Sequence, residues 1–289
     1  MNLQQMEVFL AIVETGTYTA AGEKTGYTQS RVTQMMKALE NEIGFPLFVR
    51  SHYGAALTRA GESLLPTVKR IWHDNESLNA EISDIRGLKR GTLNIGTYTS
   101  CSVHWLPPVI AEFREKYPDI DFNVTESGKA EIIAGLEDRS FDIALTSRPE
   151  NDDLDFISLY RDPVVVVFPS GHEFSENKRV DIHKLEGRDF IMSNVKFDND
   201  VTRVLGKENV KPNVVVTSMD DFAIMSMVLE GIGIAMLPEL VIRDFVLPDV
   251  EYRELDPPQY RELGIVVPSV RAAGPITRTF MEILMTYFE

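Results

Sequence analysis

The hydrophobic pattern of the chain changes at the segment 87–91, Gly-Leu-Lys-Arg-Gly, and this change constrains the fold more than any other feature. Before it, apolar residues recur every three or four positions, which predicts helices. After it, short runs rich in Val, Ile and Phe alternate with helical stretches, which predicts an α/β fold with parallel strand pairing. We therefore expect at least two separate parts in these 289 residues.

The charge of the chain also changes near residue 90. The net charge of −15 comes from 29 Lys and Arg against 44 Asp and Glu. Residues 1–90 hold 10 of these basic and 10 of these acidic residues, so this part is neutral and all the excess acidity lies beyond it. Since phosphate binding depends on Lys and Arg, strong non-specific DNA binding is excluded. A neutral first part can still bind DNA if its cations share one face.

The composition predicts a soluble globular protein, with 44% hydrophobic and 25% charged residues. Cys101 is the only cysteine, which excludes an intramolecular disulfide and a multi-cysteine zinc site and agrees with a reducing compartment. The sequence shows no signal-peptide pattern and no apolar run of the roughly 18 residues that a membrane helix needs. We therefore expect a cytoplasmic protein without membrane contact.

Residues 1–58 predict a winged helix-turn-helix. Apolar spacing predicts helices over 3–13 and 18–24 and a third from near Thr28, and two short runs around Tyr53-Gly54 predict a β wing. Two short helices joined by a glycine turn, the second with a polar face, are typical of this DNA-binding motif. The side chains expected to contact DNA are Thr19, Thr28, Gln29, Ser30, Arg31, Thr33, Gln34, Lys37 and Arg50.

The chemistry of these side chains supports the choice, because a recognition helix enters the major groove by its N-terminal part. Glutamine can pair with adenine, Thr33 can contact thymine, and Arg31 can bind guanine or a phosphate. Lys37, Arg50 and the hydroxyl groups suit the DNA backbone. The plainer alternative is that Thr28 only caps the helix and that Lys37 is a solvated surface charge.

Residues 59–87 predict one long helix with a heptad seam. The seam residues are spaced alternately four and three positions apart: Leu64, Val68, Ile71, Asn75, Leu78, Ile82 and Ile85. A seam this regular favours pairing with a second copy of the chain, and one buried asparagine within it fixes the register. The alternative is that the seam packs on its own domain with Asn75 exposed. We expect a homodimer.

Residues 91–289 predict a two-lobed α/β domain. Strands are expected at 92–96, 122–125, 142–146, 164–168, 190–193, 213–217 and 232–236. A further apolar run at 263–268 resembles the run at 163–168, and two crossings of this kind suit a region divided into two lobes. We expect lobe I at about 91–161 and 267–289, and lobe II at about 162–266.

The ends of these strands predict a ligand site. In two-lobed α/β domains ligands collect at the carboxyl ends of strands and the N-termini of helices. The candidate ligand residues are Thr97, Thr99, Ser100, Cys101, Thr146, Arg148, Ser193, Ser218 and Met219. Arg148 suits a carboxylate, whereas any of the hydroxyls could instead cap a helix. Cys101 could be a redox-active thiol at a helix N-terminus, but a buried structural cysteine is favoured, because no resolving cysteine exists.

Motifs over nearly the whole chain resemble the LysR-type transcriptional regulators. They include TAAGEKTGYTQSRVTQMMKALENEIGFPLFVR (19–50), LTRAGESLLP (57–66), FDIALT (141–146) and LEGIGIAMLPE (229–239). The resemblance implies a winged helix-turn-helix, a linker helix that dimerises, and an effector domain similar to periplasmic binding proteins. It also implies frequent tetramers and a response to a small molecule. Ser30 and Gln34 stand where the family usually has proline and a basic residue, so operator details of relatives do not transfer.

The sequence disfavours two other classes of function. An enzyme is disfavoured, because the five histidines show no metal-ligand spacing and no nucleophile pairs with a base. A ligand-binding module without DNA activity is disfavoured by the helix-turn-helix pattern. We expect a transcriptional regulator without a metal, an organic cofactor or catalytic residues. Its expected partners are operator DNA, further copies of itself, RNA polymerase and a small-molecule effector such as a carboxylate.

Overall fold

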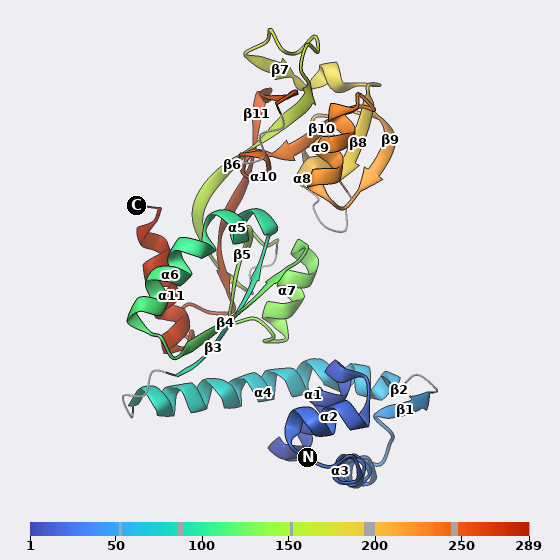
Figure 1. Ribbon diagram of the computed structural model, residues 1–289, viewed down its shortest axis with the longest axis vertical. Helices are drawn as coiled ribbons and strands as arrows, with labels where there is room; N and C mark the ends of the chain where they lie inside the picture. Colours follow the sequence, from blue (N-terminus) through green and yellow to red (C-terminus); the bar gives the residue numbers. More distant parts are fainter. Residues whose placement is uncertain (52–53, 86–89, 151–152, 194–199, 244–247, 289) are drawn as a thin grey trace. The chain divides into compact units, whose positions relative to one another are not determined.

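The computed structural model describes residues 1–51, 54–85, 90–150, 153–193, 200–243 and 248–288 (Figure 1). The chain divides into two compact units, Met1–Leu88 with Glu137–Ser140, and Lys89–Leu136 with Phe141–Glu289. In the described ranges, no helix combines the length and the apolar character that a bilayer crossing requires.

The N-terminal headpiece, residues 1–58, contains the three predicted helices and the predicted wing. Each helix begins at a polar cap and ends at a glycine in the left-handed conformation, as its sequence signals indicate. Its elements are α1 (Leu3–Thr15), α2 (Tyr18–Thr25), α3 (Gln29–Ile43), β1 (Phe48–Ser51) and β2 (Gly54–Leu57).

Close backbone contact fixes the turn between α2 and α3. A Cβ atom on Gly22 would meet the carbonyl oxygen of Tyr27 at 2.6 Å, so only glycine fits there. Gly26, in the same turn, has a φ of +72°, which glycine adopts without strain. Phe9, Ile12 and Leu39 are fully buried in the headpiece core. The turn and the core together hold α3 at a defined angle to α2.

The predicted linker helix is α4 (Arg59–Ile85), and its seam has two different environments. Val68 is buried in the headpiece core, and Leu64 packs against that core. Farther along, Ile71, Leu78 and Ile82 are 40%, 54% and 38% exposed, with Asn75 half-buried between them. The side chain of Ile85 lies outside the described residues. The first part of the seam therefore packs on its own domain, and the part beyond it leaves apolar side chains in solvent.

The C-terminal domain is built on one mixed sheet. Among the described residues, nine strands form this sheet in the order β4-β3-β5-β11-β6-β10-β8-β9, with β7 pairing β11. The strands are β3 (Gly91–Thr97), β4 (Ile120–Glu126), β5 (Ile143–Ser147), β6 (Asp155–Pro169), β7 (Arg179–Asp181), β8 (Asp189–Ser193), β9 (Asn213–Ser218), β10 (Ile234–Pro238) and β11 (Val250–Val267).

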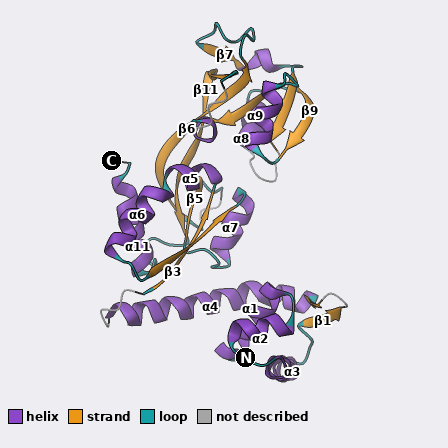
Figure 2. Cartoon of the chain, in the orientation of Figure 1, coloured by secondary structure: helices purple, strands orange, loops and turns teal. Residues whose placement is uncertain are grey.

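Two long strands, β6 and β11, run through both lobes of this domain (Figure 2). They are antiparallel to each other. The C-terminal part of β11 also pairs with β5 in lobe I, and the C-terminal part of β6 also pairs with β10 in lobe II. The sequence predicted only a short part of each, at 164–168 and 263–268. The expectation of parallel pairing is correct for β3 with β4 and β5, and for β8 with β9 and β10, but wrong for the strands that join the lobes.

Helices cover the sheet in both lobes. Lobe I consists of β3, β4 and β5 with α5 (Thr99–His104), α6 (Leu106–Lys116), α7 (Lys129–Glu137) and α11 (Pro275–Thr286). Lobe II consists of β7, β8, β9 and β10 with the 3-10 helix η1 (Ile182–Leu185), α8 (Asp200–Lys207), α9 (Asp221–Leu229) and α10 (Glu239–Ile242).

The run of valines in β6 is buried on both faces, which explains its continuous apolar sequence. Val164, Val166 and Phe168 belong to one apolar cluster, while Val165 and Val167 belong to a second on the opposite face. The core of lobe I is a third cluster, completed by residues of β11 and α11. The carboxyl ends of the parallel strands in both lobes point toward the junction between the lobes (Figure 1).

Candidate DNA-binding face and ligand site

One face of α3 is buried and the other is open to solvent. Val32, Met35, Met36 and Leu39 lie in the headpiece core. The polar side chains predicted to contact DNA lie on the remaining face: Gln29, Ser30, Arg31, Gln34 and Lys37 are exposed, and Thr33 is partly exposed. Within the described residues, neither Arg31 nor Lys37 forms an ion pair. Both cations are therefore available to a phosphate or a base.

Thr28 has a structural role that leaves part of its hydrogen-bonding capacity free. Its hydroxyl oxygen accepts from the backbone N–H of Arg31 at 3.3 Å, which caps α3. The hydroxyl proton can still be donated to a phosphate oxygen. Thr19 is exposed on α2. The structure thus supports the capping interpretation of Thr28 and leaves room for DNA contact as well.

The wing is attached to the recognition helix through Glu40. One carboxylate oxygen, Oε1, accepts from the backbone N–H groups of Leu47, at 2.7 Å, and Phe48, at 3.2 Å. At the other end of the wing, Ala55 donates its N–H to the carbonyl oxygen of Gly16 at 2.7 Å. Arg50 stands in β1, but its side chain lies outside the described residues. These bonds fix the wing relative to α1 and α3.

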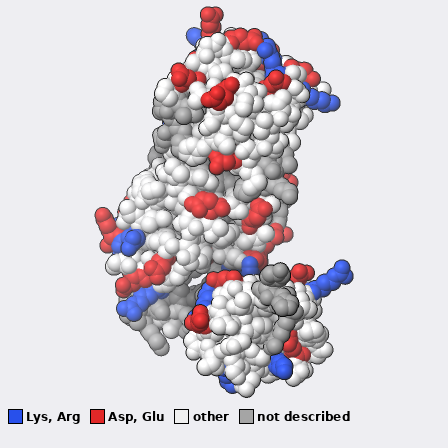
Figure 3. Space-filling model, turned by 45° about the vertical axis from the view of Figure 1, so that its right-hand side comes forward, with Lys and Arg blue, Asp and Glu red and all other residues white. Residues whose placement is uncertain are grey.

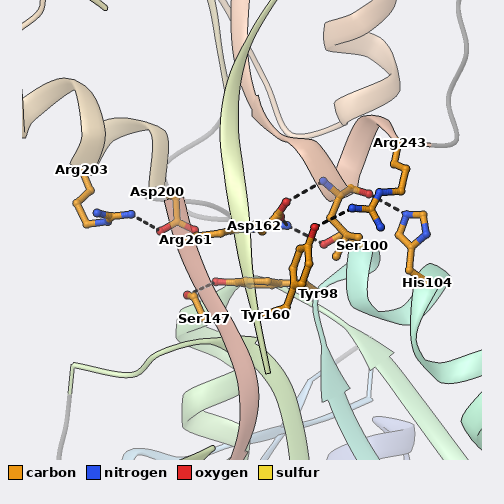
Figure 4. A network of polar contacts seen from close by, with 11 residues as sticks. Tyr98, Ser100, His104, Ser147, Tyr160, Asp162, Asp200, Arg203, Arg243 and Arg261 are labelled. Atoms are coloured by element: carbon orange, nitrogen blue, oxygen red, sulfur yellow. Dashed lines mark hydrogen bonds and ion pairs between the residues drawn. The ribbon is translucent and has the colours of Figure 1, made fainter. Parts of the chain in front are cut away.

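At the junction of the two lobes, Arg261 of β11 and Asp162 of β6 form a buried ion pair (Figure 4). The two residues are direct partners across the antiparallel strands. Nε of Arg261 donates to Oδ2 of Asp162 at 2.8 Å, and Nη2 lies 2.8 Å from the same oxygen. The side chains are 4% and 0% exposed. Each charge offsets the other, because either one alone at this depth would be strongly destabilising.

The ion pair connects helices of both lobes. Arg261 Nη2 also donates to Ser100 Oγ, in α5 of lobe I, at 2.9 Å. Asp162 Oδ1 accepts from the backbone N–H of Leu240, in α10 of lobe II, at 2.9 Å. Nε2 of His104, the last residue of α5, lies 2.8 Å from the Leu240 carbonyl oxygen and carries the proton, since a carbonyl only accepts. One buried network therefore joins α5, α10 and both crossing strands.

Two tyrosines lie next to this network (Figure 4). The Tyr98 hydroxyl lies 2.9 Å from Ser147 Oγ at the end of β5, and the Tyr98 ring faces the Arg261 guanidinium at 5.4 Å. Arg243, directly after α10, donates to the Tyr160 hydroxyl at 2.7 Å. Hydroxyl groups and paired charges from both lobes thus converge on the carboxyl ends of the strands.

Thr97 and Cys101, both predicted ligand residues, are buried. Thr97 Oγ1 donates to the Leu145 carbonyl oxygen at 3.3 Å and is fully buried. Cys101 is fully buried in the lobe I core, where burial raises the pKa of its thiol to about 12. A thiol with this pKa is not ionised near neutral pH, which favours the structural interpretation of Cys101. Thr99, between them, is exposed.

Other predicted ligand residues differ in their burial and in their hydrogen bonds. Thr146 is fully buried, and its Oγ1 has no hydrogen-bond partner among the described residues. Ser193 is buried at the end of β8. Ser218 Oγ accepts from the backbone N–H of Asp220 at 3.2 Å in the turn before α9, and Met219 is 56% exposed. Ser218 thus has a structural partner, while Met219 is open to contact.

Arg148 is already engaged. Its Nε and Nη2 donate to the two carboxylate oxygens of Glu262 at 2.8 Å and 3.1 Å. Its guanidinium carbon also lies 4.4 Å from the centre of the Phe156 ring. The expectation of a carboxylate ligand depends on Arg148 and on the hydroxyl-rich loops, and in the structure Arg148 is paired with Glu262. In the described ranges, no three His, Cys, Asp or Glu side chains gather as metal ligands would.

Two family models match the chain: "Bacterial regulatory helix-turn-helix protein, lysR family" over residues 3–62 and "LysR substrate binding domain" over residues 86–289. The chain belongs to the LysR family of transcriptional regulators. A relative with 28% identity is the uncharacterized HTH-type transcriptional regulator YvbU of Bacillus subtilis, covering 100% of this chain and 99% of that protein. The probable HTH-type regulator LrrA of Synechococcus elongatus is 30% identical over 98% of this chain and 96% of its own length.

Solved structures show the same fold. A full-length variant of OxyR from Pseudomonas aeruginosa matches with a TM-score of 0.77 at 19% identity, over 100% of this chain and 94% of that one. Full-length CbnR complexed with its target DNA matches with a TM-score of 0.69 at 18% identity, over 99% of both chains. The regulatory domain of Synechocystis CcmR in complex with 2-PG matches with a TM-score of 0.64 at 21% identity, over 69% of this chain and 98% of that domain.

Membership of the family settles the class of function. The chain is a LysR-type transcriptional regulator, with a DNA-binding headpiece and a C-terminal effector domain, and not an enzyme. Its partners are DNA and a small-molecule effector. Acidic side chains outnumber basic ones on the effector domain in the view of Figure 3, as the net charge beyond residue 90 requires.

Of the buried network, the sequence indicated Ser100 but gave no sign of Asp162 and Arg261. Asp162 precedes Pro163 and a run of valines, and Arg261 stands in a polar stretch, so neither has a local signal of burial. Their pairing depends on the register of β6 against β11, which joins positions 99 residues apart. A sequence pattern reports spacing along one element, not register between two distant ones.

Proposed function

We propose that the regulator contacts its operator through the exposed face of α3 and the wing. The observation that carries this proposal is that the α3 residues with base-pairing or phosphate-binding groups are exposed, while the apolar residues of the same helix are buried. Gln29, Arg31 and Gln34 are assigned to bases, and Lys37 with the hydroxyls of Thr19, Thr28 and Ser30 to the backbone. Thr33 contacts a thymine methyl, and Arg50 of β1 contacts a flanking phosphate.

The second part of the proposal is a homodimer formed through α4. Ile71, Leu78 and Ile82 leave apolar surface in solvent at heptad spacing, and a second copy of α4 would cover it. Asn75 lies on the same seam, where it would fix the register. Each headpiece has few cations, so a single headpiece would bind DNA weakly. Linking two headpieces raises the affinity for DNA, because the first contact raises the effective concentration of the second headpiece.

A second apolar surface supports further self-association, up to the tetramer. Strand β9 is an edge of the sheet in the effector domain. Val214 and Val215 of this strand are 46% and 43% exposed, and Phe222 of the adjoining α9 is 54% exposed. An exposed edge strand with apolar side chains is a site for association rather than a solvated surface.

The third part of the proposal concerns the effector, which binds at the junction of lobes I and II. Thr99 and Ser100 in lobe I and Ser218 and Met219 in lobe II supply contacts there. Binding changes the balance between lobe arrangements, and the dimer passes this change to the spacing of its two headpieces. The regulator works in the cytoplasm, where operator DNA and RNA polymerase are, and needs no metal or organic cofactor for these steps.

Fluorescence anisotropy of the purified full chain tests the proposal, with its own upstream intergenic DNA and a scrambled duplex of equal length as control. We expect tight binding to the upstream DNA only, weakening as salt rises, because phosphate contacts release counterions. Equal weak binding to both duplexes at every salt concentration would contradict sequence-specific contact with that DNA. Variants of α3 then assign the individual contacts.

A further inference from the structure

The arginines that reach the lobe junction are engaged by groups of the protein. Arg261 binds Asp162 and Ser100. Arg203 of α8 binds Asp200 and the carbonyl oxygen of Tyr260, both within 3.3 Å. Arg243 binds Tyr160, and Arg148 binds Glu262, as described above. An anionic effector would therefore have to compete with a carboxylate or a tyrosine for each of these cations, of which Figure 4 shows Arg203, Arg243 and Arg261.

Unlike these arginines, the carboxylate of Asp221 near the junction has no partner among the described residues. Asp221 is the first residue of α9, directly after the turn that follows β9, and it is partly buried. Its side chain forms no hydrogen bond and no ion pair with any described residue. Its neighbour Asp220 differs, because Asp220 Oδ1 caps the helix by accepting from the backbone N–H of Ala223 at 2.9 Å.

The electrostatic surroundings of Asp221 place it beside the buried network. Burial raises the pKa of its carboxyl, attraction from the Arg261 guanidinium lowers it, and repulsion from Asp220 raises it, in that order of size. Arg261 is therefore within electrostatic range, but it is already paired with Asp162. Among the described groups that act on the pKa of Asp221, no other cation appears.

We propose that the effector carries a cationic nitrogen, an amine or a guanidinium group, that pairs with Asp221. This inference rests on the proposed effector site at the lobe junction. A cationic group would give Asp221 the partner that no described residue supplies, and the pair would be strengthened by its shielding from water. A second carboxylate at this place would meet Asp221 and Asp162 without an unengaged arginine to balance it.

Thermal-shift titrations of the purified full-length protein test the proposal. The probes are putrescine, succinate and 1,4-butanediol, which share a four-carbon chain and differ in charge. The variants are Asp221→Asn and, as matched control, Asp220→Asn, which removes the same charge one residue away and keeps a capping side chain. We expect putrescine to raise the Tm of the wild type and of Asp220→Asn, and to bind Asp221→Asn about 30-fold more weakly or worse.

Succinate and butanediol should leave all three proteins unchanged. An equal response of wild type and Asp221→Asn to putrescine, no response included, overturns the proposal, and so does stabilisation by succinate alone. The DNA anisotropy assay is run in parallel without probes. If the protein binds its operator but fails the putrescine test, the proposed cationic effector is refuted and the proposed DNA contacts stand. If the protein does not bind its operator, the proposed DNA contacts are contradicted.

Discussion

The headpiece and the effector domain place their polar side chains in different ways. On α3, Gln29, Arg31 and Gln34 extend into solvent without ion pairs to other described residues. At the lobe junction, Asp162 and Arg261 are buried and bonded to each other and to α5 and α10. The first arrangement leaves groups available to a large partner. The second holds two lobes together and offers a ligand few unengaged charges.

This difference also explains what the sequence could predict. The headpiece was predicted element by element, because its caps, glycine turns and helical periodicity are local signals. In the effector domain the strands were found, but the length of β6 and β11 and the Asp162–Arg261 pair were not. Those features depend on the pairing of residues far apart in the chain, and no window of sequence contains both partners. The proposed site at Asp221 shares this property, since only the fold shows that no described residue pairs with it.

The largest effect is expected from breaking the buried pair. Arg261→Leu leaves Asp162 buried without a partner, so the free energy of unfolding should fall by about 3–5 kcal/mol. The matched control is Arg148→Leu, which breaks the exposed pair with Glu262 and should cost at most about 1 kcal/mol. Urea unfolding followed by circular dichroism measures both. If both variants lose the same free energy of unfolding, the buried Asp162–Arg261 pair contributes no more to stability than the exposed Arg148–Glu262 pair.

The next effect concerns the exposed seam of α4. Leu78→Asp puts a charge where a second copy of α4 should pack, so the dimer should dissociate and operator affinity should fall by about 100-fold or more. Asn79→Asp adds the same charge at the next exposed position, off the seam, and should leave the mass unchanged. Size-exclusion chromatography with light scattering reports the mass, and anisotropy reports the affinity. A Leu78→Asp variant that stays dimeric would place the dimer contact elsewhere.

A smaller effect is expected at the recognition helix. Gln34→Ala should reduce discrimination at one base pair of each half-site by about 1–3 kcal/mol, because a bidentate contact to adenine is lost. Asn41→Ala, exposed near the other end of α3, serves as control. Anisotropy with a series of single-substitution operators measures discrimination, and light scattering confirms that the dimer persists. Unchanged discrimination would remove Gln34 from the base-contacting set.

The smallest effect is the dependence of stability on pH at Asp221. Its pKa in the folded chain lies above the ordinary value, so between those two values the folded chain holds a proton that the unfolded chain has released. Stability from this group therefore falls as pH rises through that window. Asp221→Asn should thus be slightly more stable than the wild type at neutral pH, with the gain disappearing toward about pH 4. The Tm of Asp221→Asn and of the wild type, measured across this pH range, tests this expectation. If Asp221→Asn is less stable than the wild type at neutral pH, Asp221 has a favourable partner in the folded chain.

The two crossing strands have a consequence for the order in which the protein is made. The headpiece and α4 are complete once the first 85 residues have been synthesised. Lobe I begins next with β3. Its strand β5, however, pairs with residues 263–266 of β11, which are synthesised much later. The core of lobe I also includes Phe280 and Leu284 of α11, near the end of the chain. Lobe II is thus inserted into an unfinished lobe I. During synthesis, the part that binds DNA can fold long before the part that senses the effector, and loss of the last helix would damage the first lobe, not the second.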